Sequence, residues 1–171
     1  MTDDTRSAEL VDHFKLGMRR LAAGVSLITT ASGGNRAGLI ATAVSSVSTE
    51  PPTLLICVNE SASAHSVIQE SGAFCVNVLP VGCLDIAGQF SSTARKGERF
   101  QDGDWLELAS GAPVLSASIV AFDCEVAQSI KYNTHSIFIG KILAVHLGAE
   151  EVTPLIYFDR TFHRGLAEIA R

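Results

Sequence analysis

The stretch LIATAVSSVSTEPPTLLICV, residues 39–58, decides the fold class because two strands follow each other in it directly. Residues 39–47 are small or β-branched and predict one strand, which Pro51 and Pro52 end because proline cannot donate to a sheet. Residues 53–58 are mostly apolar and predict a buried strand. A strand that leads straight into the next is typical of an antiparallel sheet and argues against a doubly wound one.

Upstream of this stretch, the sequence predicts a helix and a short strand. The helix spans residues 7–22, and Gly24 closes it. Its apolar residues recur every three or four positions and therefore share one face. These residues are Leu10, Phe14, Met18 and Leu21. Residues 25–30 are rich in β-branched side chains and predict a strand, which turn residues follow at 32–35.

Downstream, the pattern predicts two short helices and another strand. Residues 63–71 predict a helix that Gly72 ends, and residues 73–79 predict a strand. Residues 81–112 form the least regular stretch, in which one helix is expected at about 83–90.

Two long strands dominate the last third of the chain. They are predicted at 120–131 and 137–145, and a final strand pair follows at 155–158 and 161–163. Asp123 falls on the face opposite to the apolar residues of the first long strand. With about seven or eight strands, the predicted fold class is mainly β. We expect an antiparallel Greek-key β-barrel with flanking helices, in a single domain that spans residues 1–171.

The composition is that of an ordinary globular chain with an acidic balance. Of 171 residues, 47 % are apolar, and the formal net charge is −5. An acidic chain without a basic stripe argues against nucleic acid and anionic membranes as partners. The polar start lacks the features of a signal peptide, and no apolar run approaches the roughly 18 residues that span a bilayer. We therefore expect a cytoplasmic protein.

Several common catalytic and cofactor motifs are absent from the sequence. There is no glycine-rich dinucleotide fingerprint, no phosphate-binding P-loop and no serine nucleophile elbow. Cys57, Cys75, Cys83 and Cys124 are scattered without a C-x-x-C spacing, so we expect reduced core cysteines. No pair of histidines has metal-ligand spacing, and no metal site is expected.

Two polar clusters are candidates for ligand binding. Small residues at 41–48 either let a flat ligand lie close to a strand's backbone or belong to a tightly packed strand with outward hydroxyls, which local physics alone favours. Residues 59–65 place hydroxyls at the start of a predicted helix, where they either cap the helix or bind an anion. Arg95, Lys96 and Arg99 would add positive charge to the same anion. Together, the clusters suit a flat ring with a phosphate tail.

Six stretches along the chain match the pattern of one known family in the same order. They are 38–48 with Pro51-Pro52, 54–59 with Ser61 and Ser63, 74–79, Gln89-Phe90 with Arg99-Phe100 and Trp105, 133–135, and 154–158. Through these stretches the chain resembles the flavin reductase family over about residues 10–166, with Val44 where many relatives carry asparagine and Asn133 where glycine is common.

The resemblance implies an FMN-binding split barrel that forms a homodimer and takes hydride from NADH or NADPH. FMN, with FAD as the alternative flavin, would accept the hydride, because in such enzymes the cofactor supplies the redox chemistry and the protein aligns the rings. The family supplies reduced flavin to two-component monooxygenases such as 4-hydroxyphenylacetate 3-monooxygenase. A monooxygenase is therefore the expected partner.

The resemblance also implies roles for individual residues. His135 is expected beside the face where the nicotinamide stacks, as the catalytic residue. Four residues are expected beside the isoalloxazine, namely Thr42, Ala43, Val44 and Ser45, and Ser46 is expected to bind the same cofactor. Asn59, Ser61, Ser63 and Arg95 are expected around the ribityl phosphate, and Phe90 is expected in the same cofactor site.

Two alternatives remain open at the level of sequence. The FMN could stay bound and pass electrons to a bound acceptor such as cob(II)yrinate or another corrinoid. The split barrel also hosts flavin- or haem-binding proteins without reductase activity, in which nicotinamide oxidation is absent.

Overall fold

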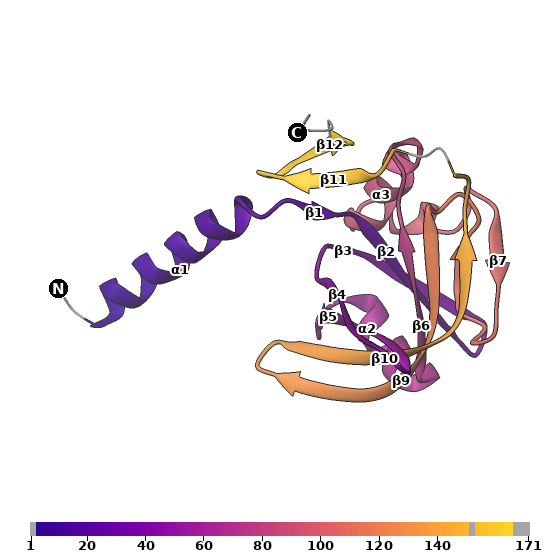
Figure 1. Ribbon diagram of the computed structural model, residues 1–171. Coiled ribbons are helices and arrows are strands. Elements are labelled where there is room, and N and C mark those ends of the chain that lie inside the picture. The colour runs from indigo at the N-terminus through magenta and orange to yellow at the C-terminus, as the bar shows by residue number, and fades with distance from the viewer. Residues whose placement is uncertain (1–2, 151–152, 166–171) are drawn as a thin grey trace.

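A seven-stranded antiparallel sheet forms the centre of the computed structural model, which describes residues 3–150 and 153–165 (Figure 1). The strand order is β3-β2-β6-β9-β10-β5-β4, and every neighbouring pair is antiparallel. The bounds are β2 Ser26–Ser32, β3 Asn35–Ala41, β4 Val44–Thr49, β5 Pro52–Asn59, β6 Ala73–Val78, β9 Val120–Tyr132 and β10 His135–Leu147. The predicted mainly β fold with antiparallel strands is confirmed.

The single strand predicted at 39–47 is wrong, because the chain breaks at Thr42 and Ala43. β3 pairs with β2 at one edge of the sheet, whereas β4 pairs with β5 at the opposite edge. A tight local bond from the Val44 N–H to the Thr42 carbonyl, 3.1 Å long, accompanies the change of direction. Because β3 also contacts β5, the sheet curls and its two unpaired edges approach each other. The barrel is therefore split between β3 and β4.

Large apolar side chains fill the inside of the curled sheet. Phe74 on β6 and Phe138 on β10 are fully buried and pack with Ile28 and Ile56. Gly140 leaves room for the Phe74 ring, since a Cβ at this position would lie 2.9 Å from the ring's Cε1. A register shift between β9 and β10 lies at the same position. Both the glycine and the shift therefore make room for the large side chain of Phe74.

Two short helices cover the sheet near its β2–β3 side. α2 (Ser63–Ser71) contacts β2 and β3, and α3 (Leu84–Ser91) contacts β3. Gly72 ends α2 in a left-handed conformation, with φ 66° and its N–H bonded to the Ile68 carbonyl, as the sequence predicts. The expected helix at about 83–90 corresponds to α3, which a 3₁₀ turn (Val81–Cys83) precedes. A second 3₁₀ turn, Lys96–Glu98, lies in the basic segment.

Two smaller sheets complete the strands, and the sequence predicts only the pair at 155–158 and 161–163 in one of them and no strand of the other. β1 (Ala23–Gly24), β11 (Leu155–Phe158) and β12 (Thr161–Arg164) form one, so Gly24 belongs to a strand and does not close the helix. β7 (Trp105–Glu107) lies within the stretch 81–112, which the sequence marks as irregular, and its partner β8 (Pro113–Leu115) follows that stretch directly. The count of seven or eight strands was therefore too low. Such short strands are set by their partners and carry little periodicity of their own.

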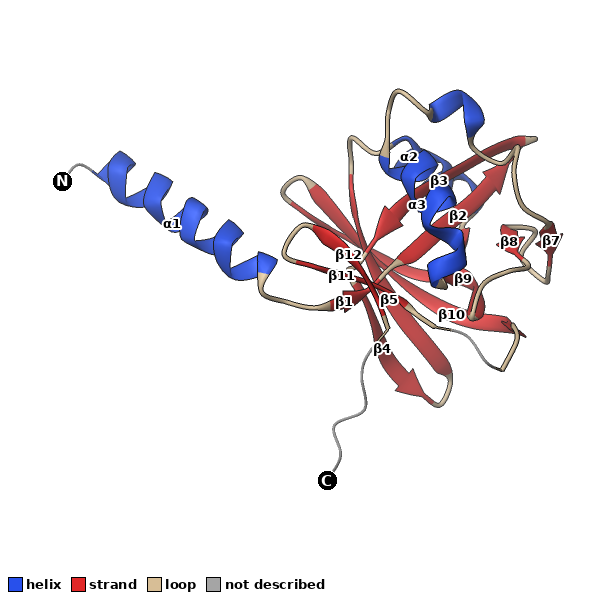
Figure 2. Cartoon of the chain, turned by 90° about the horizontal axis from the view of Figure 1, so that it is seen from above, coloured by secondary structure: helices blue, strands red, loops and turns tan. Residues whose placement is uncertain are grey.

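The N-terminal helix α1 (Asp3–Arg19) begins and ends earlier than predicted and points away from the strands (Figure 2). Its apolar side chains share a face as expected, but none of the other residues that the structure describes covers that face. Leu10 is 70 % exposed and Phe14 64 % exposed. An uncovered apolar face of this kind is typical of an interaction surface.

Candidate functional site

A cavity of about 500 Å³, here called the Thr42 cavity, lies against the end of β3. Leu39, Ile40, Ala41 and Thr42 form one wall, and Phe90 and Ser91 of α3 form another. Tyr157, Arg160 and Phe162 line the side formed by β11 and β12. The lining is largely apolar with one cation, and the volume is within the range of small-molecule sites.

A second cavity of about 360 Å³, the Ser61 cavity, adjoins the first because both are lined by Leu39 and Phe90. It contains the hydroxyls of Ser61, Ser63 and Thr93, and the cations Lys96 and Arg99. None of the described residues that line it is acidic. Hydroxyl donors and cations without a competing carboxylate are what a phosphate group requires.

Arg99 is held rigidly at the wall of the Ser61 cavity. Its guanidinium donates to the backbone carbonyls of Gln89, Gly38, Phe90 and Ser92, at 3.2, 3.4, 3.0 and 3.3 Å respectively. It also lies 5.5 Å from the centre of the Phe90 ring. Partial burial lowers the pKa of Arg99, but an arginine remains protonated at any physiological pH. Arg99 therefore joins the end of α3 to β3 and keeps a positive charge beside the cavity.

Arg95, predicted to bind phosphate, lines neither cavity. Its guanidinium donates to both carboxylate oxygens of Asp85, at 3.0 and 3.1 Å, and to Glu98 at 2.8 Å. These hydrogen bonds raise the pKa of Arg95 and lower that of Asp85. The two cations that line the cavity are its neighbours Lys96 and Arg99. A phosphate role for Arg95 stays a prediction, and this geometry favours the neighbours instead.

Asn59 and Ser61 form a compact loop at the end of β5. The Asn59 Oδ1 accepts from the Ser61 N–H at 2.9 Å and from the Ser61 hydroxyl at 2.8 Å. Such a local bond preforms a turn after the strand. Asn59 thus shapes the loop, and Ser61 and Ser63 line the cavity.

His135 lies beside this loop because it pairs with Asn59 across β10 and β5. The Glu60 N–H donates to the Thr134 carbonyl at 2.9 Å, and Lys131 pairs with Glu60 at 2.9 Å. Asn133 turns the hairpin with φ 50°, a conformation that asparagine tolerates. The Thr134 hydroxyl is 2.9 Å from His135 Nδ1. These contacts fix the histidine relative to the loop that precedes α2.

The predicted ring-binding residues lie where the chain crosses the split. Thr42 lines the Thr42 cavity, and the Ala43 carbonyl accepts from the Cys57 N–H at 3.2 Å. Val44 packs against the core, whereas Ser45 and Ser46 lie on the exposed part of β4. Because β4 is the last strand of its sheet, its outer edge leaves backbone groups available to the edge of a flat ring.

Sequence reasoning missed Arg160, which is the only cation among the described residues that line the Thr42 cavity. It follows Asp159 in the turn between β11 and β12, and both residues have positive φ, 46° and 67°. Neither is a glycine, so the turn carried no clear signal in the sequence. Arg160 also lines a cavity of about 420 Å³ beneath α1, together with Phe14, Met18 and Thr42.

The two joined cavities fit a flat ring with a phosphate tail, held in a split antiparallel barrel. Residues 18–166 match the model of the flavin reductase like domain, and the chain therefore belongs to this family. Within the described ranges, no cluster of three or more His, Cys, Asp or Glu residues could hold a metal ion, and no helix could cross a membrane.

Relatives with known names are similar over most of the chain. The FMN reductase (NADH) RutF of Pseudomonas syringae pv. syringae strain B728a is 42 % identical over 151 residues, which are 88 % of this chain and 84 % of that protein. A proposed flavin reductase of Haemophilus somnus 129PT superposes with a TM-score of 0.86 and 34 % identity, covering 90 % and 98 % of the two chains. The flavin reductase PheA2 superposes with a TM-score of 0.81 and 28 % identity, covering 98 % and 100 %.

Proposed function

We propose that this protein is an NADH-dependent flavin reductase that transfers hydride from the reduced nicotinamide to FMN. The observation that carries the proposal is the continuity of the Thr42 and Ser61 cavities, one suited to a ring and the other to a phosphate. The name of the Pseudomonas relative supports both the flavin and the NADH. When bound, FMN supplies the redox chemistry, and the chain's own residues bind and orient it.

The residues divide this work between two ends of the site. Ser61, Ser63, Lys96 and Arg99 hold the phosphate through charge-assisted hydrogen bonds. At the other end, the unpaired edge of β4, the strand that follows Thr42, hydrogen-bonds to the polar edge of the ring through its backbone. His135 lies next to the phosphate loop and positions the nicotinamide. Alignment of two bound reactants is itself a large part of such catalysis.

The phosphate assignment is tested by comparing FMN with riboflavin, which has the same ring and no phosphate. In the Ser61→Ala, Ser63→Ala double variant, the Kd for FMN should rise by about tenfold, while the Kd for riboflavin stays within about twofold. Flavin fluorescence measures both constants. Ser129→Ala, an exposed serine on β9, is the matched control. Equal losses for the two flavins would show that these hydroxyls do not hold a phosphate.

The reaction itself is tested by anaerobic addition of NADH to the protein with FMN. The flavin absorbance should bleach far faster than with FMN alone. Binding without bleaching, with NADPH tried as well, would leave a flavin-binding protein and contradict the proposed reductase.

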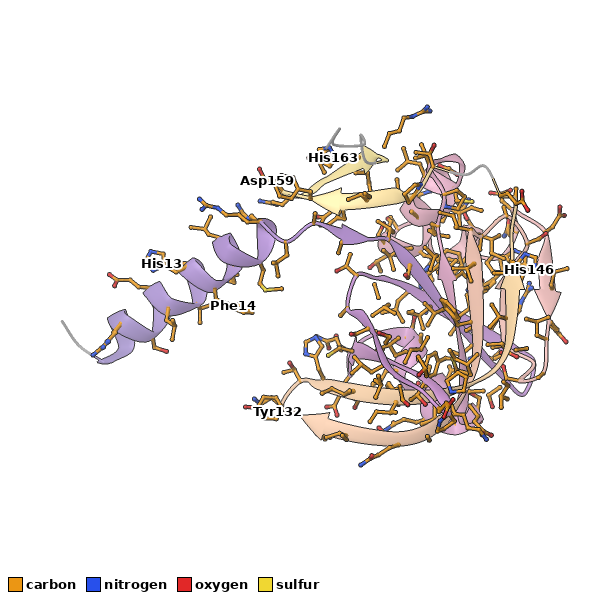
Figure 3. The ribbon with its side chains drawn as sticks, in the orientation of Figure 1. His13, Phe14, Tyr132, His146, Asp159 and His163 are labelled. Carbon is orange, nitrogen blue, oxygen red and sulfur yellow. The ribbon has the colours of Figure 1, made fainter. Side chains whose placement is uncertain are left out.

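We further propose that the protein works as a cytoplasmic homodimer that supplies reduced flavin to a monooxygenase partner. All four cysteines are free thiols, as is usual in a reducing compartment. The exposed apolar face of α1 supports self-association. The tip of the β9–β10 hairpin is also exposed, with Tyr132 72 % accessible, and Figure 3 shows Phe14 on the side of α1 that faces this hairpin.

A further inference from the structure

A buried histidine, His65, has no role in the proposed reaction, yet it lies between two parts of the site. It belongs to the first turn of α2, directly after the loop that carries Ser61 and Ser63. Its side chain is 5 % exposed, and its Nε2 is hydrogen-bonded to the hydroxyl of Ser136 at 2.8 Å. Ser136, which is 1 % exposed, directly follows His135 on β10. The pair therefore connects the start of α2 to the strand that begins with the histidine of the site.

Packing and a backbone bond hold His65 in this position. Its ring lies against Phe138 of β10, with the two ring centres 5.4 Å apart. Its N–H donates to the Ala62 carbonyl at 2.9 Å, which fixes the histidine to the turn that opens α2. A buried hydrogen bond is costly to break, because the polar groups left behind cannot reach water. The start of α2 and Ser136 are therefore expected to move together.

A second hydrogen bond holds the other neighbour of His135. The Thr134 carbonyl accepts from the Glu60 N–H at 2.9 Å. Both residues that flank His135 are thus bonded to the segment 60–65, which supplies two hydroxyls of the Ser61 cavity. An anion that orders this segment would also order the backbone on both sides of His135.

We propose that His65 and Ser136 are positioning residues that couple the phosphate of the flavin to hydride transfer. Phosphate bound in the Ser61 cavity holds residues 60–65 in place, and the bond between His65 and Ser136 extends this order to His135. Part of the binding energy of the phosphate then raises the rate of reduction and not the affinity. This inference rests on the proposed function, both for the phosphate site and for His135.

Riboflavin, which lacks the phosphate, tests the coupling without any change to the protein. Stopped-flow absorbance measures the anaerobic rate of flavin reduction at saturating NADH, with the protein saturated by FMN or by riboflavin. Wild-type protein should reduce bound FMN at least about tenfold faster than bound riboflavin. In Ser136→Ala, the FMN rate should fall about tenfold, toward the riboflavin rate. The riboflavin rate and the Kd for FMN should change less than about twofold.

Further variants separate a positioning role from a purely structural one. Ser136→Thr keeps the hydroxyl and should restore most of the FMN rate. His65→Phe keeps a ring against Phe138 without the hydrogen bond, and it should slow FMN reduction as much as Ser136→Ala does. The double variant should be no slower than either single variant, because both remove the same interaction. Ser118→Ala should change neither rate, since this serine is also buried but its hydroxyl has no hydrogen-bond partner among the described residues.

Other results would overturn the inference. If wild-type protein reduces bound riboflavin as fast as bound FMN, the phosphate does not act on hydride transfer, although a lower Kd for FMN would leave the phosphate site intact. Equal losses for both flavins in Ser136→Ala would give the pair a structural role only. A higher Kd for FMN with an unchanged saturated rate would assign the pair to the loop that precedes α2. If NADH bleaches neither flavin, the proposed function fails as well.

Discussion

At the scale of single residues, the hydrogen-bond partners of Asp123 give this buried carboxylate a structural role. Asp123 is fully buried, yet it accepts from the Ser110 N–H at 2.8 Å and from the Ser110 hydroxyl. It ties the loop before β8 to the sheet and lies across from Cys75 in the β6–β9 pair. The alternation of side chains along the strand predicts that Asp123 lies on the face opposite to the apolar residues, but it does not predict that Asp123 is fully buried.

His135 should govern hydride transfer more than flavin binding. It pairs with Asn59 beside the loop that precedes α2 but is not among the residues that line the Ser61 cavity. We expect His135→Ala to slow anaerobic flavin reduction by on the order of tenfold or more, with the Kd for FMN unchanged. Stopped-flow absorbance measures the rate, and fluorescence measures the Kd. Normal turnover in this variant would remove His135 from the mechanism, and loss of FMN would make it a binding residue.

The buried thiols should make the protein less stable in alkali. Burial first, and then the Asp123 carboxylate, raise the pKa of Cys124 to about 12, and the same causes raise that of Cys75 further. A raised pKa in the folded state stabilises the protein below the unfolded value, near pH 9, and this contribution is lost as the pH rises above it. The free energy of unfolding under reducing conditions should therefore fall above about pH 9.

Matched variants separate the thiols from other alkaline effects. In Cys75→Ala with Cys124→Ala, the alkaline decline should be shallower than in wild type, whereas Ser129→Ala, at the exposed serine on β9, should leave it unchanged. An identical pH dependence in all three proteins would contradict this origin of the decline.

At the scale of elements, β3 and α3 lie in close contact where the Thr42 and Ser61 cavities adjoin. A Cβ at Gly38 would lie 2.8 Å from the Phe90 Cε1 and 2.9 Å from the Ile28 carbonyl oxygen. Phe90 lines both the Thr42 and the Ser61 cavities. The absence of a side chain at Gly38 therefore sets the position of the ring that joins the two cavities.

Gly38→Ala should disturb the site and the fold together. We expect the free energy of unfolding to fall by about 1–3 kcal/mol, because the added methyl overpacks a closed contact. FMN affinity should also fall as Phe90 moves into the groove. Chemical denaturation and flavin titration measure the two effects. Gly82→Ala, where no atom lies within 4 Å of the added Cβ, is the control. Unchanged FMN affinity would show that Phe90 does not shape the binding site.

Elements with a strong local signal were predictable from the sequence, and those that depend on distant partners were not. The helix at 63–71 with its Gly72 end follows from periodicity and from one glycine, and the structure has both. The break at Thr42 depends on which strands β3 and β4 pair with, and small β-prone residues on both sides hide it. Arg95 and Arg99 lie in the same basic run, and only their tertiary partners separate an ion-paired arginine from one at the cavity.

At the scale of the whole molecule, α1 stands apart from the barrel yet is tied to the site. The Asp159 N–H donates to the Arg19 carbonyl at 2.9 Å, which joins the end of α1 to the turn that carries Arg160. Thr42, Ala43 and Arg160 line the cavity beneath the helix. Whatever covers the apolar face of α1 therefore also lies near the Thr42 cavity.

Charge on the apolar face of α1 should dissociate the proposed dimer. Leu10→Glu with Phe14→Glu places two carboxylates on that face, where desolvation would oppose association. Sedimentation equilibrium should give a dimer for wild type and a monomer for the double variant. His13→Glu, on the opposite side of the helix in Figure 3, should remain a dimer. A wild-type monomer would refute the homodimer, and a dimeric double variant would place its interface elsewhere.

The two-residue connection at Thr42 and Ala43 also constrains which lengths of chain this fold can accept. It links opposite edges of the sheet, and Val44 directly after it faces the core. One residue more or less would reverse the alternation along β4 and turn Val44 outward. Insertions and deletions among natural relatives should therefore avoid the interval from Ala41 to Val44. They should gather instead where no strand changes edges, as in the turn at Asn133 and Thr134.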